Sequence, residues 1–150
     1  MHSCDAVRLD FRSNYQMLDF VQMVADHLGR LAGLDDESVH WVGVAVRESV
    51  INAIKHGNCN DERKRVYVEF TPPPAEPCAG LAICVRDEGC GFDPTTLPDA
   101  LAPENVLKPT VRGIFLIRSF MDEMALRRMP DGGMELRMIK RAPAVQSLQS

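Results

Sequence analysis

The order of hydrophobic and polar positions predicts a strand followed by a helix at the start of the chain. Residues 5–11 alternate in the manner of a half-buried strand. Ser13 and Gln16 then have capping-box spacing, and the apolar residues that follow recur at helical intervals as far as Gly33. The first helix is therefore expected between these two signals.

A second helix is predicted in the next segment, again from the spacing of its apolar residues. It is expected to begin near Asp35 or Asp36, because either side chain can cap the first turn. It runs to His56, and Gly57 supplies a natural stop. Two amphipathic helices in succession then need a sheet on which to bury their apolar faces.

The middle of the chain has the pattern of two strands. Residues 64–70 place valine and phenylalanine on one face, and residues 80–87 are apolar nearly throughout, as expected for a central strand. The proline-rich stretch 71–77 between them cannot continue a strand, because proline removes a donor from the ladder. This stretch is expected to be an exposed connection.

The last part of the chain combines a long loop, a helix and a hairpin. A loop rich in glycine and proline covers residues 88–112, and residues 113–121 form a short apolar helix. Residues 122–129 and 133–141 are predicted to be two strands, because a Pro-Asp-Gly-Gly turn joins them. After Ala142 the tail is small and polar, and we expect it to fray.

This order of elements defines the expected fold class. It fits an α+β two-layer sandwich, with a mixed, mostly antiparallel sheet covered by helices on one face. At 150 residues the chain has the length of one ordinary domain. We therefore expect a single domain over residues 1–150, with its core at about residues 5–141.

Composition and charge argue against several classes of protein. The 45% hydrophobic and 25% charged fractions are those of a globular chain. A net charge of −4 argues against nucleic acid as a partner, since phosphate contacts need a dense basic surface. We expect neither a membrane span nor a signal peptide. Five cysteines without C-x-x-C spacing favour a reducing cytoplasm over a disulfide framework.

The second helix carries the first candidate site. Glu48, Asn52 and His56 recur every four residues and form a slowly winding polar stripe. A solvated helix face explains such a stripe without any function, although asparagine is a poor residue for mid-helix. The functional alternative is a magnesium and phosphate site, in which the Asn52 amide oxygen is a ligand and Glu48 accepts a proton. This helix alone leaves both interpretations open.

A glycine-rich loop gives the second candidate. Asp87 ends the apolar strand, and Gly89 and Gly91 follow it. Two glycines let the backbone approach a ligand closely, but they are equally typical of a plain turn. The segment is neither a Rossmann fingerprint nor a Walker A loop. An aspartate in this position can accept a hydrogen bond from an exocyclic amine such as that of adenine.

The start of the last helix is the third candidate. Gly113 is expected at its N-terminus, where free N–H groups and the helix dipole favour phosphate. Lys108 and Arg112 would add positive charge there. The same helix has an apolar face that fits the core, and the two roles are compatible.

Taken together, three motifs resemble those of the GHKL (Bergerat-fold) ATPases and, among these, the small bacterial anti-sigma-factor serine kinases. The motifs are E-x-x-x-N-A-x-x-H-G at 48–57, D-x-G-x-G-F-D at 87–93 and R-G-I-F-L-I-R-x-x-M-D-E at 112–123. The likeness covers most of the chain. It implies the Bergerat fold, ATP and Mg²⁺ as cofactors, and an ATP-dependent serine/threonine protein kinase that acts as an anti-sigma factor.

The resemblance also implies a role for each matching residue. Glu48 corresponds to the catalytic base, Asn52 to the magnesium ligand, and Asp87 to the aspartate that binds adenine. The segment from about residue 95 to 110 corresponds to a lid that closes over the phosphates. The other residues expected to contact the nucleotide are His56, Gly89, Gly91, Lys108, Arg112 and Gly113.

The partners that the resemblance implies are an anti-anti-sigma protein as phospho-acceptor and a sigma factor, with the kinase itself a homodimer in the cytoplasm. One position departs from the family pattern, because Val111 stands where a glycine is usual. A β-branched residue resists positive φ, which predicts a lid that closes differently and weaker nucleotide binding. This departure keeps one alternative open, a non-catalytic nucleotide-binding adaptor that sequesters a sigma factor or other regulator. A further possibility is an ATPase that uses water as acceptor.

Overall fold

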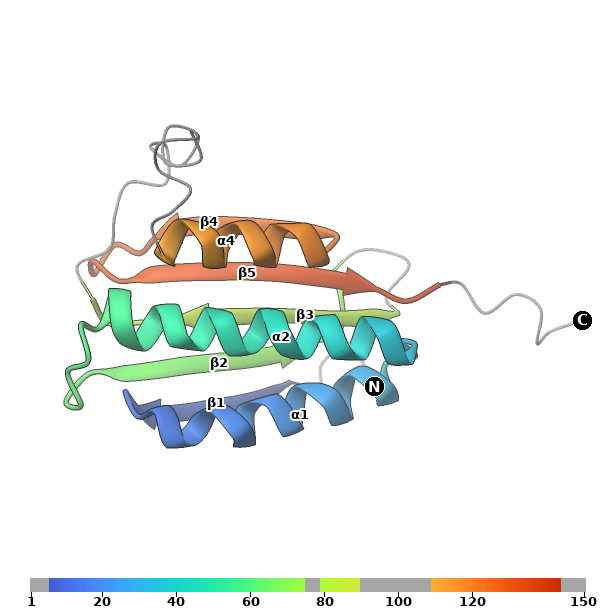
Figure 1. The fold of residues 1–150 in the computed structure, drawn as a ribbon, viewed down its shortest axis with the longest axis horizontal. Coiled ribbons are helices and arrows are strands. Elements are labelled where there is room, and N and C mark those ends of the chain that lie inside the picture. Colours follow the sequence, from blue (N-terminus) through green and yellow to red (C-terminus); the bar gives the residue numbers. More distant parts are fainter. Residues whose placement is uncertain (1–5, 75–78, 90–108, 144–150) are drawn as a thin grey trace, which may run out of the picture.

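The chain folds around a five-stranded sheet (Figure 1). The computed structural model describes residues 6–74, 79–89 and 109–143. The strands are ordered β1-β2-β3-β5-β4, and every neighbouring pair is antiparallel. Their bounds are Val7–Arg12 for β1, Arg65–Thr71 for β2, Gly80–Arg86 for β3, Glu123–Arg128 for β4 and Met134–Arg141 for β5.

The path of the chain explains why the described strands form no parallel pair, although a mixed sheet was expected. Two helices lie between β1 and β2, so the chain returns to the sheet in the opposite direction. Strands β3 and β4 point the same way, but β5 lies between them and is antiparallel to both. The sheet is thus fully antiparallel over its described strands.

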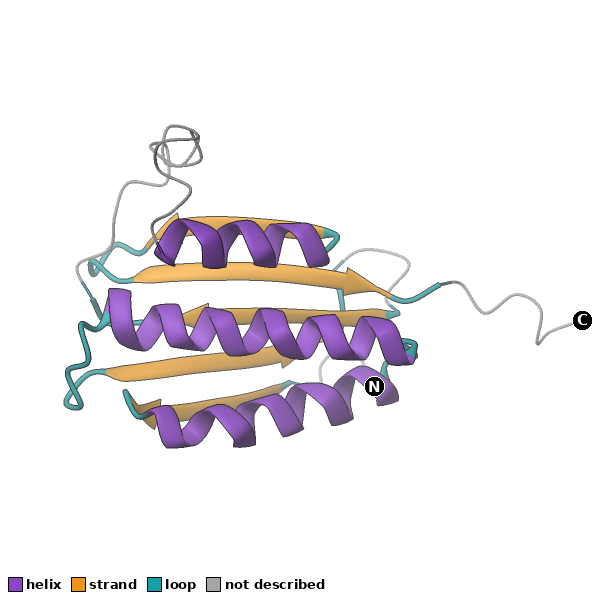
Figure 2. Cartoon of the chain, viewed as in Figure 1, coloured by secondary structure: helices purple, strands orange, loops and turns teal. Residues whose placement is uncertain are grey.

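The three α-helices cover one face of this sheet (Figure 2). They are α1 (Leu18–Leu31), α2 (Asp36–Asn52) and α4 (Pro109–Phe120). Helix α2 lies between α1 and α4 and contacts both. The predicted α+β two-layer sandwich, with helices on one face, is confirmed.

The hydrophobic core fills the space between the sheet and the helices. On β2, Val66, Val68 and Phe70 are buried, and the residues that alternate with them are partly exposed. Strand β3 and helix α2 add further buried side chains to this core: Leu81, Ile83, Val85, Val42, Val46 and Val50. Among the described residues, no helix combines the length and the apolar character of a membrane span.

Helix α2 begins as predicted and ends differently. Asp35 caps it, because its Oδ1 accepts a hydrogen bond from the main-chain N–H of Ser38 at 2.7 Å. After α2 the helix widens into a π-helical turn, Ala53–Gly57. The chain then turns through Cys59 and Asn60, whose φ angles are 53° and 59°. Widened turns of this kind are frequent at functional sites.

The start of the first helix differs from the predicted capping box. A 3-10 turn, Tyr15–Met17, precedes α1, and its cap is Asn14, whose Oδ1 accepts from the N–H of Gln16 at 2.8 Å. Ser13 is buried instead, and its hydroxyl donates to the main-chain oxygen of Lys64 at 2.8 Å. A partner distant in sequence therefore engages the hydroxyl that local spacing assigned to the helix.

The position of the core predicts that replacing two different phenylalanines with alanine will have very different effects on stability. Phe70→Ala should lower the free energy of unfolding by roughly 3–5 kcal/mol, because the ring is fully buried and leaves a cavity. Phe115→Ala on α4 is the matched control, since that ring is 55% exposed, and it should change stability by about 0.5 kcal/mol or less. Denaturant unfolding measures both. Equal losses would contradict this core.

Candidate functional site

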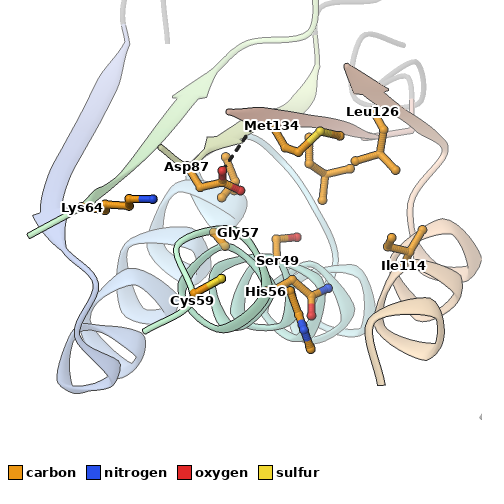
Figure 3. Close-up of a pocket in the computed structure, with 13 residues that line it drawn as sticks. Ser49, His56, Gly57, Cys59, Lys64, Asp87, Ile114, Leu126 and Met134 are labelled. Carbon is orange, nitrogen blue, oxygen red and sulfur yellow. Dashed lines mark hydrogen bonds between the residues drawn. The ribbon is translucent and has the colours of Figure 1, made fainter. Parts of the chain in front are cut away.

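A cavity of about 310 Å³ opens at the end of α2, between the helices and the sheet (Figure 3). Most of its wall is apolar and comes from β3, β4, β5 and α4: Val85, Leu126, Met134, Leu136 and Ile114. The polar residues that line it are Ser49, Asn52, His56, Lys64 and Asp87. A mostly apolar cavity with a few polar groups is the usual form of a small-molecule site.

Asp87 follows the last residue of β3 and is held by three hydrogen bonds. Its N–H donates to the main-chain oxygen of Met134 at 3.1 Å. Its Oδ1 accepts from the N–H groups of Gly89, at 2.9 Å, and Met134, at 3.2 Å. Its Oδ2 accepts no hydrogen bond from the described residues and therefore remains available to a donor on a ligand.

Burial raises the pKa of Asp87 above its ordinary value of 3.8. The two N–H groups that its carboxylate accepts from, and the charge of Lys64, oppose that rise. A carboxylate with these partners is a charged acceptor in a largely apolar wall. Such a group recognises a hydrogen-bond donor strongly, because little water competes for it.

Three glycines allow other segments to reach Asp87. A Cβ on Gly57 would overlap the Oδ2 of Asp87, and a Cβ on Gly133 would overlap its main-chain oxygen. A Cβ on Gly89 would overlap the main-chain oxygen of Gly57. The π-helical turn, the end of β3 and the β4–β5 turn therefore meet only because these side chains are absent.

The three residues of the polar stripe do not all face the same part of the structure: some line the cavity and some face α4. Asn52 and His56 line the cavity, whereas Glu48 is not part of its lining. Glu48 and Asn52 both face Gly113 of α4, since a Cβ there would lie 2.5 Å from Glu48 Oε1 and 2.8 Å from Asn52 Nδ2. Gly113 thus lets α4 pack against the polar stripe.

The sequence predicted that Gly113 begins the last helix, and the structure shows that it does not. Helix α4 starts four residues earlier, at Pro109, so the free N–H groups of its first turn precede Gly113. Val111 lies in the same helical turn, in a backbone conformation that valine adopts without positive φ. Gly91, Lys108, the side chain of Arg112 and most of the expected lid lie outside the described residues.

Two residues of the lining could carry positive charge, and only His56 was predicted. Burial, and secondarily the charge of Lys55, lowers the pKa of His56 below its ordinary value of 6.5, so the neutral form of the ring predominates at pH 7. Lys64 extends toward Asp87 in Figure 3. Lys64 lies just before β2 and belongs to none of the three motifs. The left-handed turn at Cys59 and Asn60 separates it from the helical stripe. Sequence spacing therefore missed Lys64.

The oxygen donors on α2 fit a magnesium ion that is also bound to phosphate. The amide of Asn52 and the carboxylate of Glu48 lie one helical turn apart and are hard ligands. Among the described residues, no group of three or more His, Cys, Asp or Glu could hold a metal. Mg²⁺ commonly takes one or two protein ligands and completes its shell with water and phosphate. This donor set suits that arrangement.

Fold and cavity together define a class of protein: an α+β sandwich with a nucleotide-sized cavity, a partly buried carboxylate at one end and hard oxygen donors nearby. Residues 11–140 match the family model of the histidine kinase-like ATPase domain. The chain therefore belongs to the histidine kinase-like ATPase domain family. Its membership agrees with the resemblance read from the three motifs.

Several relatives are similar to nearly the whole chain. The anti-sigma F factor of Bacillus subtilis is 28% identical over 139 residues, which cover 89% of this chain and 90% of that protein. The anti-sigma F factor of Oceanobacillus iheyensis is 30% identical over 121 residues, 78% of each chain. A Staphylococcus aureus protein named serine-protein kinase RsbW is 26% identical over 145 residues, 91% of this chain and 86% of that one.

Solved structures show the same fold. A structure of the RsbU and RsbW domains of a Mycobacterium tuberculosis protein superposes with a TM-score of 0.64 at 15% identity. It is matched over 95% of this chain, which spans about a third (35%) of that longer one. The histidine kinase domain of the Erythrobacter litoralis protein EL346 gives a TM-score of 0.53 at 16% identity, over 93% of this chain and 68% of that one.

Asp87→Asn should weaken ATP binding roughly ten- to a hundredfold, because a hydrogen bond to a charged acceptor is lost. It should also raise the stability of the nucleotide-free protein at pH 7. A pKa raised on folding means that the stability linked to this group is full at low pH and lost as the pH rises through the folded value. The neutral amide escapes that loss and can still accept from Gly89 and Met134.

Calorimetric titration with ATP and thermal unfolding without nucleotide measure the two effects. In the wild-type protein, ATP affinity should fall with decreasing pH, beginning above the range in which an exposed aspartate protonates. Unchanged ATP affinity in Asp87→Asn would remove this carboxylate from the site.

The lining also predicts a protected thiol. Cys59 is exposed and lines the cavity, so iodoacetamide should modify it and ATP with Mg²⁺ should slow the modification several-fold. Burial raises the pKa of Cys84 to about 12, so this thiol should stay unmodified at about pH 8. Peptide mass mapping separates the sites, with Cys59→Ser as control. Equal rates with and without nucleotide would place the ligand elsewhere.

Proposed function

We propose that this protein is an ATP- and Mg²⁺-dependent serine/threonine protein kinase that acts as an anti-sigma factor in a partner-switching system. The observation that carries the proposal is the cavity that Asn52 and Asp87 line together. A magnesium ligand and a purine-binding carboxylate must face one nucleotide, and these two side chains meet that requirement. The names of the relatives, anti-sigma F factor and serine-protein kinase, support the choice of reaction and partners.

Asp87 would bind the base. Its free Oδ2 accepts a hydrogen bond from the exocyclic amine of adenine, while apolar side chains such as Val85 and Met134 contact the ring. Gly57 lines the cavity beside this carboxylate, and Gly89 lets the main chain pack closely against Gly57, because neither has a side chain. His56 would contact the nucleotide as a neutral ring, as its lowered pKa requires.

Asn52 would hold Mg²⁺ through its amide oxygen, toward the phosphates. When bound, the ion neutralises phosphate charge and orients the terminal phosphate. Gly113 faces Asn52 and would let the first turn of α4 come close to the same phosphates. Gly91, Lys108 and Arg112 remain proposed contacts, and the segment from 95 to 110 remains a proposed lid.

Glu48 would act as the general base. It takes the proton from the hydroxyl of the acceptor serine as that oxygen bonds to the γ-phosphorus. The bond from the γ-phosphorus to the bridging oxygen breaks, and ADP leaves with that oxygen and its negative charge. Glu48 faces the same glycine as Asn52, so base and magnesium ligand lie on one side of α2.

The proposed acceptor is an anti-anti-sigma protein, and the proposed second partner is a sigma factor. We also propose that the kinase works in the cytoplasm as a homodimer. The helical backbone at Val111 weakens the case for the adaptor alternative, because the valine that motivated it needs no positive φ there. The oxygen donors at Glu48 and Asn52 favour catalysis further.

Glu48→Gln should leave nucleotide binding intact and slow phosphate transfer by a factor on the order of 10²–10⁴, the usual contribution of a general base. Glu37→Gln is the matched control, because that residue lies in the first turn of the same helix, far from the cavity lining. Transfer of labelled phosphate from ATP to the acceptor protein measures the rate. A Glu48 variant that transfers at the wild-type rate would remove this residue from the mechanism.

The same assay separates the three activities. Label on an acceptor serine supports the kinase. Nucleotide binding without label on any acceptor supports the adaptor, and free phosphate in the absence of a partner protein supports an ATPase that uses water.

A further inference from the structure

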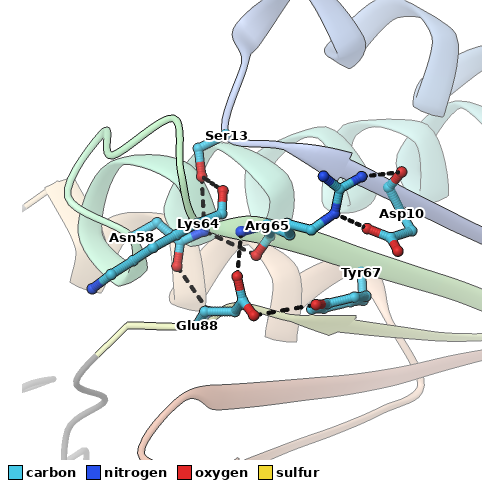
Figure 4. Close-up of polar contacts among 7 residues, drawn as sticks. All are labelled: Asp10, Ser13, Asn58, Lys64, Arg65, Tyr67 and Glu88. Atoms are coloured by element: carbon cyan, nitrogen blue, oxygen red, sulfur yellow. Dashed lines mark hydrogen bonds and ion pairs between the residues drawn. The ribbon is translucent and has the colours of Figure 1, made fainter.

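Asn58 is a fully buried polar residue directly after the π-helical turn, and its side chain joins three separate segments (Figure 4). Its Oδ1 accepts from the main-chain N–H of Glu88 at 2.8 Å. Its Nδ2 donates to Ser13 Oγ at 2.8 Å and to the main-chain oxygen of Arg65 at 3.0 Å. Only this orientation of the amide satisfies all three partners, because the N–H of Glu88 cannot accept a hydrogen bond.

The bond to Glu88 matters because the sheet does not hold this segment on the β2 side. Pairing between β2 and β3 ends at Tyr67 and Arg86, one residue before Asp87. The next N–H along that edge is donated to the side chain of Asn58 instead of to a strand. Asn58 thus takes the place of a ladder partner at the point where Asp87 leaves the sheet.

Two consecutive residues, Gly57 and Asn58, contact two other consecutive residues, Asp87 and Glu88. Gly57 lies against the Oδ2 of Asp87, and Asn58, the next residue, binds the N–H of Glu88. The carboxylate of Glu88 is fixed in turn, since its Oε1 accepts from the N–H of Arg65 at 2.6 Å. The end of β3 is therefore tied to the end of the π-helical turn and to the start of β2.

We propose that Asn58 is a positioning residue for Asp87. It fixes the main chain next to Asp87, and so directs Oδ2 toward the amine of the base. Without Asn58, β5 would hold the main chain and only the side chain of Glu88 would tie the segment to β2. The inference rests on the proposed role of Asp87 in binding adenine. It adds that selectivity for the amine depends on a buried amide that does not itself line the cavity.

The test compares ATP with purine riboside triphosphate, which lacks the amine at position 6. The wild-type protein should bind ATP roughly tenfold or more tightly than this analogue. In Asn58→Ala that preference should fall to about threefold or less, because the main chain at Glu88, and with it the neighbouring N–H of Gly89 that holds Oδ1, loses an anchor. General loosening of the fold would weaken both ligands alike and leave their ratio unchanged, so the ratio reports positioning.

Ser13→Ala is the matched control, because it removes one partner of Asn58 and keeps the bond to Glu88. It should lower the melting temperature and retain the preference for ATP. Should Asn58→Ala fail to fold, Asn58→Ser keeps a hydroxyl at the buried position, too short to reach Glu88, and should lose the preference in the same way.

The outcomes distinguish this inference from the function on which it rests. A wild-type preference for ATP that persists in the folded Asn58 variants overturns the positioning role alone. A wild-type protein that binds both triphosphates equally overturns the role of Asp87 in base recognition, and the inference with it.

Discussion

The candidate site depends on main-chain segments that approach more closely than any side chain would allow. Gly57, Gly89 and Gly133 bring the π-helical turn, the end of β3 and the β4–β5 turn around one carboxylate. None of the three has a positive φ, so steric contact, rather than backbone conformation, requires glycine at these positions. Without this contact, Asp87 would stand apart from α2, and the cavity would lose its charged acceptor.

The carboxylate that this packing encloses costs stability in the absence of a ligand. Burial raises its pKa, and two main-chain N–H groups and Lys64 offset only part of that effect. A ligand that supplies a donor to Oδ2 relieves the remaining cost, so the same desolvation that weakens the nucleotide-free fold strengthens recognition. Active sites commonly trade stability for function in this way. The network of Asn58 and Glu88 contributes rigidity without adding an unpaired polar group, since every buried side-chain nitrogen or oxygen of the described residues has a hydrogen-bond partner.

Alternation and helical spacing were sufficient to predict the strands, the helices and their order, because each element buries one face on the common core. Helical spacing made Asn52 a candidate, the glycine-rich loop made Asp87 one, and the resemblance of the three motifs implied their roles. The fold brings both residues to one cavity. Local spacing could not reveal partners distant in sequence. The hydroxyl of Ser13 was predicted to cap the first helix, but it donates to the main-chain oxygen of Lys64. Helix α4 begins at Pro109, in a segment that was predicted to be a loop.

The polar stripe of Glu48, Asn52 and His56 runs from α2 into the π-helical turn, and its members contact Gly113, the cavity or both. Glu48 and Asn52 lie in regular α-helix, four residues apart, and both face Gly113. His56 lies in the wider turn that follows, and it lines the cavity together with Asn52. Asn52 is therefore the one residue of the stripe that both lines the cavity and faces Gly113. A ligand that fills the cavity would meet Asn52 as well as Asp87, since both line it, and a neutral amide oxygen can meet a metal–phosphate group without adding a further negative charge.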